Sequence, residues 1–488
     1  METIVSIRPF IAILASAVVV ALIIMSRNRP NLRESWTYLA ALVKFALVIS
    51  MFPDIFSGKI IEYTLFTVLP GIELKFRVDA LGLFFATTAS FLWIIATTYS
   101  IGYMRSLNEH AQTRYYACFA IALSSALGVA FSANLFTLYL FYEVLSIMTY
   151  PLVAHHEDDE AWEGSKKYIV YLMGASKTFL LGALILTYMI TGTLDFQPGG
   201  IFTTGMSQTL VTITYICFLL GFAKAGIMPL HNWLPSAMVA PTPVSGLLHA
   251  VAVVKVGVFS VVRVMLDTFG IDVMSAFNLG MPTVYFVSIT ILAASIIALT
   301  KDDLKARLAY STVSQLSYVI LGVALLTPHG ISGGILHIGN HAFSKITLFF
   351  CAGSIFVASH IKKISNLSGI GYKMPLTMAA FTIGALSMIG VPAMAGFTSK
   401  WYMGIGAMEA MDTVPLVVLL ASTVLNAAYF LPIVFKAYFE SPEGNVHLEG
   451  VKEAPKFVLV PLLVTAFITV AIGVYPDFLL SLAERVLQ

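Results

Sequence analysis

Long apolar runs dominate the chain, and short polar segments separate them. A helix needs about 20 mostly apolar residues to cross a bilayer. The runs are too long, and alternate too little in polarity, for the strands of a membrane β-barrel. The pattern therefore predicts an all-α polytopic membrane protein with fourteen spans, near 4–26, 36–57, 79–102, 114–131, 133–153, 167–190, 208–230, 244–266, 281–299, 308–327, 332–357, 376–400, 413–438 and 456–479.

The amino-acid composition narrows the class of protein further. Of the 488 residues, 58% are hydrophobic and only 11% are charged, whereas soluble domains carry about 25% charged residues. A net charge of +2 provides no basic surface for nucleic acid. The three cysteines, Cys118, Cys217 and Cys351, stand alone in apolar runs, so neither disulfides nor iron–sulfur clusters are expected. A membrane protein without a cofactor of its own is the expectation.

Lysine and arginine are concentrated in alternate loops. One set of loops holds sixteen: Arg27, Arg29, Arg33, Arg105, Arg114, Lys166, Lys167, Lys301, Lys305, Arg307, Lys362, Lys363, Lys373, Lys436, Lys452 and Lys456. The other set holds five: Arg8, Lys59, Lys75, Arg77 and Arg485. Cytoplasmic loops are enriched in these residues. We therefore expect both termini on the outer side of a cell (inner) membrane.

Seven basic residues fall within the predicted spans: Lys44, Lys177, Lys224, Lys255, Arg263, Lys345 and Lys400. Glu143 is the one carboxylate near mid-membrane. A charge at this depth costs about 2.5–3.5 kcal/mol on insertion scales, and such residues usually mark an ion or proton path. The cost also argues against a purely structural subunit.

Each of these residues also has a plainer explanation. Arg263 lies near a helix end, from which its side chain can reach the interface. Lys44 can pair with a neighbouring subunit or a lipid, and Lys177 fits a structural ion pair as well as a relay. Lys255 and Lys345 lie near the centres of their spans, so for them, as for Glu143, a transport role is favoured.

His337, His341 and Lys345 are spaced four residues apart. On a helix this spacing places them in one stripe about 12 Å long. A single membrane histidine usually packs through hydrogen bonds, but three titratable groups in one stripe favour a proton wire. Ser344 and Asn340 beside them can hold bridging water. A metal site is disfavoured because no carboxylate or third histidine joins the stripe.

The seventh and twelfth predicted spans are interrupted by Pro229 and Pro392. Proline frees backbone groups, which a membrane helix tolerates only where protein or water satisfies them. Paired broken helices indicate inverted-repeat transporters. Lys224 precedes the first proline and Lys400 follows the second, so we expect a functional lysine at each break.

Five sequence blocks carry a family resemblance. They are GFAKAGIMPLHNWLPSA at 221–237, APTPVSGLLHAVAVVK at 240–255, DLKARLAYSTVSQ at 303–315, NHAFSK at 340–345 and GVPAMAGFTSK at 390–400. Over about residues 70–440 the chain resembles the proton-translocating antiporter-like subunits. This family includes pumping subunits of respiratory complex I, of membrane-bound hydrogenases and of Mrp-type sodium/proton antiporters.

The resemblance implies fourteen helices containing two inverted five-helix repeats. The expected units are helices 1–3 in 1–113, the first repeat in 114–266, the second repeat in 281–438, and a loop with helix 14 in 439–488. Chain length and Lys400, together with the lack of a long lateral helix after span fourteen, favour the D-type Mrp subunit.

The resemblance also implies roles. Glu143 corresponds to the carboxylate that pairs with the broken-helix lysine, here Lys224, and Lys255 to the central relay lysine. Lys400 corresponds to the terminal lysine of the second half-channel. Apart from the resemblance, His249 lies on the same predicted helix as Lys255 and is expected to be a side inlet. The expected path comprises Glu143, Lys224, Lys255, His249, His337, His341, Lys345 and Lys400.

Four functions remain open. The first is a proton-translocating subunit of a Na⁺/H⁺ antiporter, and the second is a pumping subunit of a redox-driven complex. The others are a solute or inorganic-carbon carrier and a structural subunit. The first two require other membrane subunits as partners. The acidic loop 155–160 is expected to be solvated, and docking of a partner is its alternative.

Overall fold

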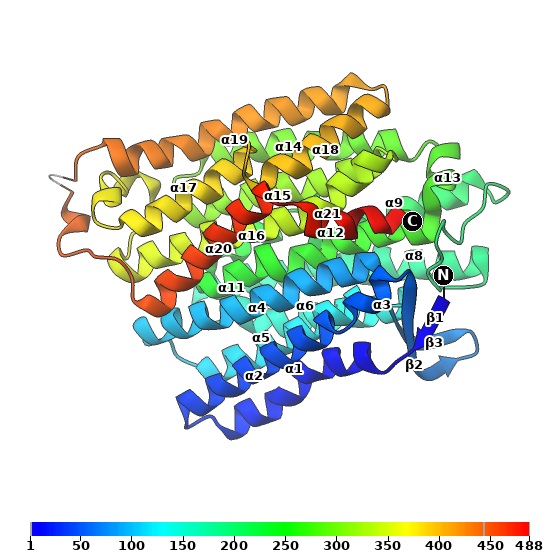
Figure 1. Ribbon diagram of the computed structural model, residues 1–488, viewed down its shortest axis with the longest axis horizontal. Coiled ribbons are helices and arrows are strands. Elements are labelled where there is room, and N and C mark those ends of the chain that lie inside the picture. Colours follow the sequence, from blue (N-terminus) through cyan, green and yellow to red (C-terminus); the bar gives the residue numbers. More distant parts are fainter. Residues whose placement is uncertain (1, 443–444, 488) are drawn as a thin grey trace.

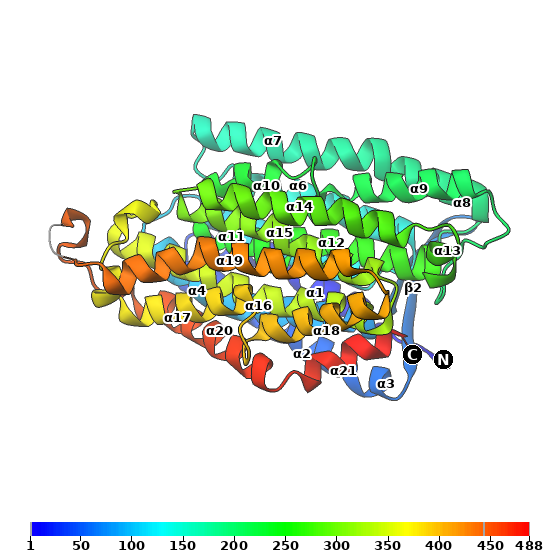
Figure 2. The same cartoon turned by 90° about the horizontal axis from the view of Figure 1, so that it is seen from above.

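The computed structural model describes residues 2–442 and 445–487. Long helices run side by side along the longest axis of the molecule (Figure 1), and the view from above shows the same alignment (Figure 2). The first strand and the last helix lie at the same end. This placement agrees with an even number of crossings, and the side of the membrane on which that end lies remains a prediction.

The first third of the chain lies along the lower part of the molecule in Figure 1. Its elements are β1 (Glu2–Val5), α1 (Arg8–Met25), α2 (Pro30–Ile49), α3 (Phe52–Phe56), β2 (Lys59–Leu69), β3 (Ile72–Val78), α4 (Ala80–Ser106), α5 (Gln112–Ala130) and α6 (Leu135–Val153). Asp79 and Asn134 cap α4 and α6 by accepting hydrogen bonds from Gly82 N and Thr137 N. These caps satisfy backbone donors that would otherwise be orphaned at the helix starts.

The middle third contains three helices that are each interrupted by π or 3₁₀ turns. The first comprises α7 (Asp159–Ala175), a π turn (Ser176–Leu180) and α8 (Leu181–Thr191). The second comprises α9 (Gln208–Gly221), a 3₁₀ turn (Ala223–Ala225), α10 (Trp233–Ser236) and a further 3₁₀ turn (Ala237–Val239). The third comprises α11 (Thr242–Gly246), a π turn (Leu247–Val251), α12 (Val253–Val264), a π turn (Met265–Phe269) and α13 (Gly270–Ala276).

The last third completes the bundle. Its helices are α14 (Gly280–Thr300), α15 (Leu304–Ala324), α16 (Pro328–Ser359), α17 (Pro375–Ile389), α18 (Ala395–Glu409), α19 (Thr413–Phe439), α20 (Lys456–Val474) and α21 (Asp477–Glu484). Short 3₁₀ turns lie at Ile364–Asn366, Ile370–Tyr372, Val446–Leu448 and Arg485–Leu487.

Each of the fourteen expected ranges overlaps a helix, so the all-α membrane fold is confirmed. Ten helical segments within the described residues are long and apolar enough to cross a membrane, and two shorter apolar helices, α9 and α17, accompany them. The count of fourteen, the two repeats and the domain boundaries remain predictions. The expected span 376–400 is in fact two helices, and the second of these continues to Glu409.

The predicted spans leave residues 58–78 as a connection between membrane helices, but this connection is not an irregular loop. Strands β2 and β3 form an antiparallel hairpin there, and β1 pairs with β2 in parallel. The hairpin is rich in β-branched and aromatic residues, which favour strands. Its turn contains Gly71 at φ +80, and Lys75 Nζ lies 2.7 Å from Glu62 across the strands.

Helix α16 is the centre of the bundle, and α4, α15, α17, α18 and α20 pack against it. Small residues let its neighbours approach closely, as membrane helices require. A Cβ at Gly334 would lie 2.7 Å from the carbonyl oxygen of Val319 on α15. The most apolar stretch of Thr242–Ala276 is completely buried, whereas that of α20 is only 33% buried. The interior thus holds the helices that carry the candidate path.

Candidate functional site

Glu143 and Lys224 lie on neighbouring elements but do not form the expected ion pair. Glu143 Oε2 lies 2.7 Å from the Nζ of Lys177, which sits in the π turn between α7 and α8. Consecutive residues on a helix point about 100° apart. On α6 the Glu143 side chain therefore faces this turn, whereas Tyr142 faces the break after α9. The structure assigns to Lys177 the partner that the sequence assigned to Lys224.

Lys224 is buried in the 3₁₀ turn of the broken helix. Its Nζ donates to the carbonyl oxygen of Tyr142 at 2.9 Å and to Ser146 Oγ at 2.6 Å. The same nitrogen lies 3.1 Å from the centroid of the Tyr142 ring. Polar and π contacts thus hold the amine, while the carboxylate next to Tyr142 contacts another lysine.

Gly257 brings the break against α12. A Cβ at this position would lie 2.2 Å from the backbone nitrogen of Ala225 and 2.3 Å from the carbonyl carbon of Lys224. Only glycine permits this approach. Gly226 ends the turn with φ +71, a conformation that side chains other than glycine rarely adopt. Lys255, two residues before Gly257 on α12, points about 200° away from the break, and its Nζ reaches His341 on α16.

A series of contacts begins at Lys255. Its Nζ lies 2.6 Å from Nδ1 of His341, and the His341 and His337 rings are 5.9 Å apart. His337 contacts Gln315 Oε1 through Nε2 at 3.0 Å and Ser399 Oγ through Nδ1 at 2.8 Å. Because an amide oxygen only accepts, Nε2 of His337 is the donor in its contact with Gln315.

Lys345 and His249 flank this series. Lys345 lies on α16 as expected, but its Nζ turns to α15 and donates to Ser311 Oγ and, at 3.3 Å, to the carbonyl oxygen of Leu308. His249 is buried against Phe349 with 4.6 Å between the rings, and neither of its nitrogens has a hydrogen-bond partner. Within the described residues, neither side chain forms a direct hydrogen bond to the series.

Lys400 lies on α18, just after the second break. Its Nζ donates to the carbonyl oxygens of Met388 and Ile389 at 2.8 and 2.9 Å. These carbonyls end α17, where a helix carries unpaired acceptors and partial negative charge. The nitrogen also lies 5.1 Å from the ring of Tyr318, which stacks on His337 with 5.5 Å between the rings.

Sequence reasoning assigned no role to Tyr318, Gln315 or Ser399, yet all three contact His337. Gln315 is part of the block 303–315, and Ser399 directly precedes Lys400. Their places within or beside the sequence blocks were the only features of the sequence that could have pointed to a role for Gln315 and Ser399.

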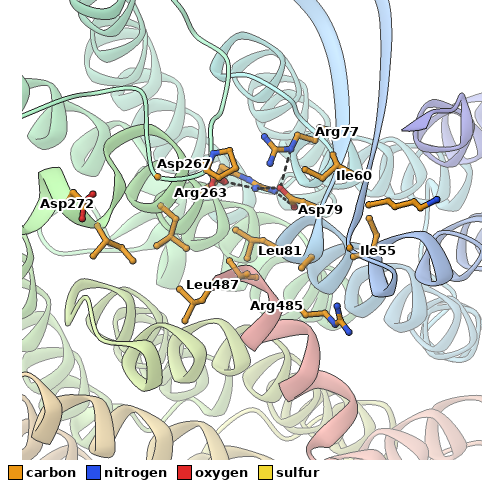
Figure 3. Close-up of a pocket in the computed structure, with 18 residues that line it drawn as sticks. Ile55, Ile60, Arg77, Asp79, Leu81, Arg263, Asp267, Asp272, Arg485 and Leu487 are labelled. Carbon is orange, nitrogen blue, oxygen red and sulfur yellow. Dashed lines mark hydrogen bonds and ion pairs between the residues drawn. The ribbon is translucent and has the colours of Figure 1, made fainter. Parts of the chain in front are cut away.

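Two other lysine or arginine residues differ from expectation. Arg263 is buried rather than reaching the interface, and it binds Asp79 at 2.5 and 2.9 Å and Asp267 at 2.6 Å. Figure 3 shows these side chains converging in a pocket of about 440 Å³. Lys44 is also fully buried, and its Nζ donates to the carbonyl oxygen of Leu123 at 3.0 Å. Both find partners within this chain.

Comparison with known proteins identifies the family. Residues 132–426 match the family described as NADH:quinone oxidoreductase/Mrp antiporter, transmembrane. NADH-quinone oxidoreductase subunit N of Desulforudis audaxviator is 33% identical over 84% of this chain and 83% of its own length. Other relatives are longer, and the chain spans 44–63% of their length.

Two solved structures share the fold. A chain in the membrane-bound sulfane sulfur reductase, an archaeal respiratory membrane complex, aligns with a TM-score of 0.87 at 24% identity, over 98% of this chain and 97% of that chain. A chain of the Mrp complex from Dietzia sp. aligns with a TM-score of 0.83 at 21% identity, over 99% and 96%. This chain therefore belongs to the NADH:quinone oxidoreductase/Mrp antiporter family and is a proton-pumping, antiporter-like membrane subunit.

Proposed function

We propose that the chain is the D-type, proton-translocating subunit of a multisubunit Na⁺/H⁺ antiporter in a cell membrane. The observation that carries the proposal is the series from Lys255 through His341 and His337 to Ser399. Imidazoles and amines that contact one another in a buried environment can pass protons.

In the first half of the path, Glu143 changes partner. When its carboxylate pairs with Lys177, as at 2.7 Å in this structure, Lys224 has no ion-pair partner among the described residues and is held by Tyr142 and Ser146. When the carboxylate turns to Lys224, it attracts the charged amine. Alternation between the two lysines loads and releases a proton at Lys224, which then passes through water to Lys255.

In the second half the proton moves through His341 and His337 toward Lys400. The Lys255 Nζ contacts Nδ1 of His341, and Nδ1 of His337 contacts the Ser399 hydroxyl. Lys345 and His249 lie beside this route, as a charged neighbour and as a side inlet. Lys400, held on the end of α17, is the last group before release.

Partner subunits are part of the proposal. The Lys177 side chain is 50% exposed, although it lies within a predicted span. A charged group is costly against lipid, so a neighbouring subunit covers this face. Sodium crosses through another subunit, because a lone mid-membrane carboxylate offers few of the oxygen ligands that hard cations require.

A second candidate is the pumping subunit of a redox-driven complex. The 33% identity with an NADH-quinone oxidoreductase subunit favours it. It uses the same path residues and takes its energy from electron transfer in other chains.

Purification of the native assembly, with mass spectrometry of its chains, separates the two candidates. Small membrane subunits without cofactors support the antiporter. Iron–sulfur or nickel-bearing chains overturn that assignment in favour of the redox pump.

A further inference from the structure

Two loops at one end of the bundle bring together four side chains that the proposed path does not use. Glu109 and His110 lie between α4 and α5, and His155 and His156 lie between α6 and α7. Both loops fall on the side predicted to be cytoplasmic. The sequence shows them as two separate polar turns, so nothing in it indicates that they meet.

Three of these groups, Glu109, His110 and His155, are spaced for a shared ligand, and His156 lies beside them. The coordinating atoms of Glu109, His110 and His155 all lie within 4.8 Å of one another. Oε2 of Glu109 lies 3.5 Å from Nε2 of His155 and 3.8 Å from Nδ1 of His156. These separations are long for hydrogen bonds. They are close to the roughly 3.3–3.5 Å between ligand atoms around a tetrahedral zinc ion.

His155 supplies an independent observation. Its side chain is completely buried, yet neither ring nitrogen has a hydrogen-bond partner. Leaving a buried polar group unsatisfied costs about 1–3 kcal/mol. The residue is held in place because Arg114 donates to its carbonyl oxygen at 3.1 Å and its ring packs on Tyr115. The orphaned ring is thus fixed beside the carboxylate and the other two imidazoles.

Local charge permits a cation here. Arg114 contacts the His155 carbonyl oxygen and is paired with Glu157, and Lys305 lines the same cavity as His156. The Glu109 carboxylate retains its charge for a ligand because only histidines lie against it as ion-pair partners among the described residues.

We propose that Glu109, His110 and His155 bind one divalent transition metal ion, with zinc as the best match and His156 beside the ion. Two imidazoles and one carboxylate suit zinc with an open fourth position, whereas magnesium and calcium prefer oxygen ligands. The metal cross-links the α4–α5 and α6–α7 loops. His156 also lines a cavity of about 560 Å³, so the ion sits at the rim of that cavity.

The test uses the full chain, purified without a histidine tag and treated with chelator. Zinc binding is measured by titration calorimetry and by metal analysis after desalting. We expect one zinc per chain. His155→Gln and His110→Gln are each expected to weaken binding at least about tenfold, since even indirect support of a metal ligand is worth 10–100-fold.

His110 is exposed, so its substitution leaves the packing intact even if His155→Gln disturbs it. His447→Gln, which removes another exposed histidine far from the cluster in sequence, is the matched control and should bind zinc like the wild type. Zinc should also raise the melting temperature of the wild type and of the control, but not of the two variants.

Cobalt provides a second probe, since tetrahedral Co²⁺ gives intense visible bands. Bands in the wild type and the control but not in His110→Gln support the site. Absence of zinc binding, or equal binding by His110→Gln and the wild type, overturns the proposal. Neither result depends on the transport activity.

Discussion

The two broken helices each have a lysine beside the break, but the two lysines are held differently. Lys224 contacts a carbonyl and a hydroxyl on α6, next to Glu143, whose carboxylate pairs with Lys177. Lys400 contacts two carbonyls at the end of its own broken helix. A carboxylate thus lies beside the first site, and helix-end dipoles hold the second. In the proposed path this difference makes the first half the switch and the second half the release site.

The largest expected effect is at the switch. Glu143→Ala removes the carboxylate that alternates between Lys177 and Lys224, so proton transport by the reconstituted assembly should fall to background. Glu62→Ala, which removes a carboxylate paired with Lys75 in the β-sheet, is the control. Normal exchange by Glu143→Ala would show that the alternating pair is not needed.

Replacement of Lys400 should have a smaller effect. Lys400→Met removes the amine from the end of α17, and we expect transport to fall about tenfold, because water can bridge part of the gap. Lys436→Met, which removes a lysine paired with Glu440 near the end of α19, should transport normally. If Lys400→Met reduced transport more than Glu143→Ala did, the assignment of switch and release site would be reversed.

Substitution of a histidine between the Lys224 and Lys400 sites tests whether the connecting series carries protons. His337→Gln keeps a side chain that can bond Ser399 but cannot accept and pass on a proton. We expect a roughly threefold loss of transport rate. His329→Gln alters a histidine on the same helix that contacts Glu409 outside the series, and it should match the wild type. Equal losses in both variants would indicate a general effect on α16.

The smallest expected effects concern stability rather than transport. Gly257→Ala and Gly396→Ala place a methyl group 2.2 Å from Ala225 N and 1.9 Å from the Ser387 carbonyl oxygen. Overpacking of this kind costs about 1–3 kcal/mol, so both variants should melt earlier in detergent. Gly174→Ala, where nothing lies within 4 Å, should not. A normal melting temperature for Gly257→Ala or Gly396→Ala would show that the backbone at the neighbouring break can move away from the added methyl group.

The sequence predicted the positions of the helices because apolar runs of membrane length are a strong signal. Proline and glycine also located both breaks. The hairpin β2–β3 was missed because its polar residues resemble a loop between spans. The partner of Glu143 was missed because the choice depends on which helices flank α6. The acceptors of Lys400 are backbone carbonyls, which carry no sequence signal.

The central claim is that protons pass through Lys255. The most direct test is sodium-driven proton uptake by the native assembly in liposomes, measured for the wild type and for Lys255→Ala with equal amounts of intact assembly. The account predicts uptake by the wild type on a sodium gradient and none above background for the variant. Uptake by Lys255→Ala at the wild-type rate would contradict the path.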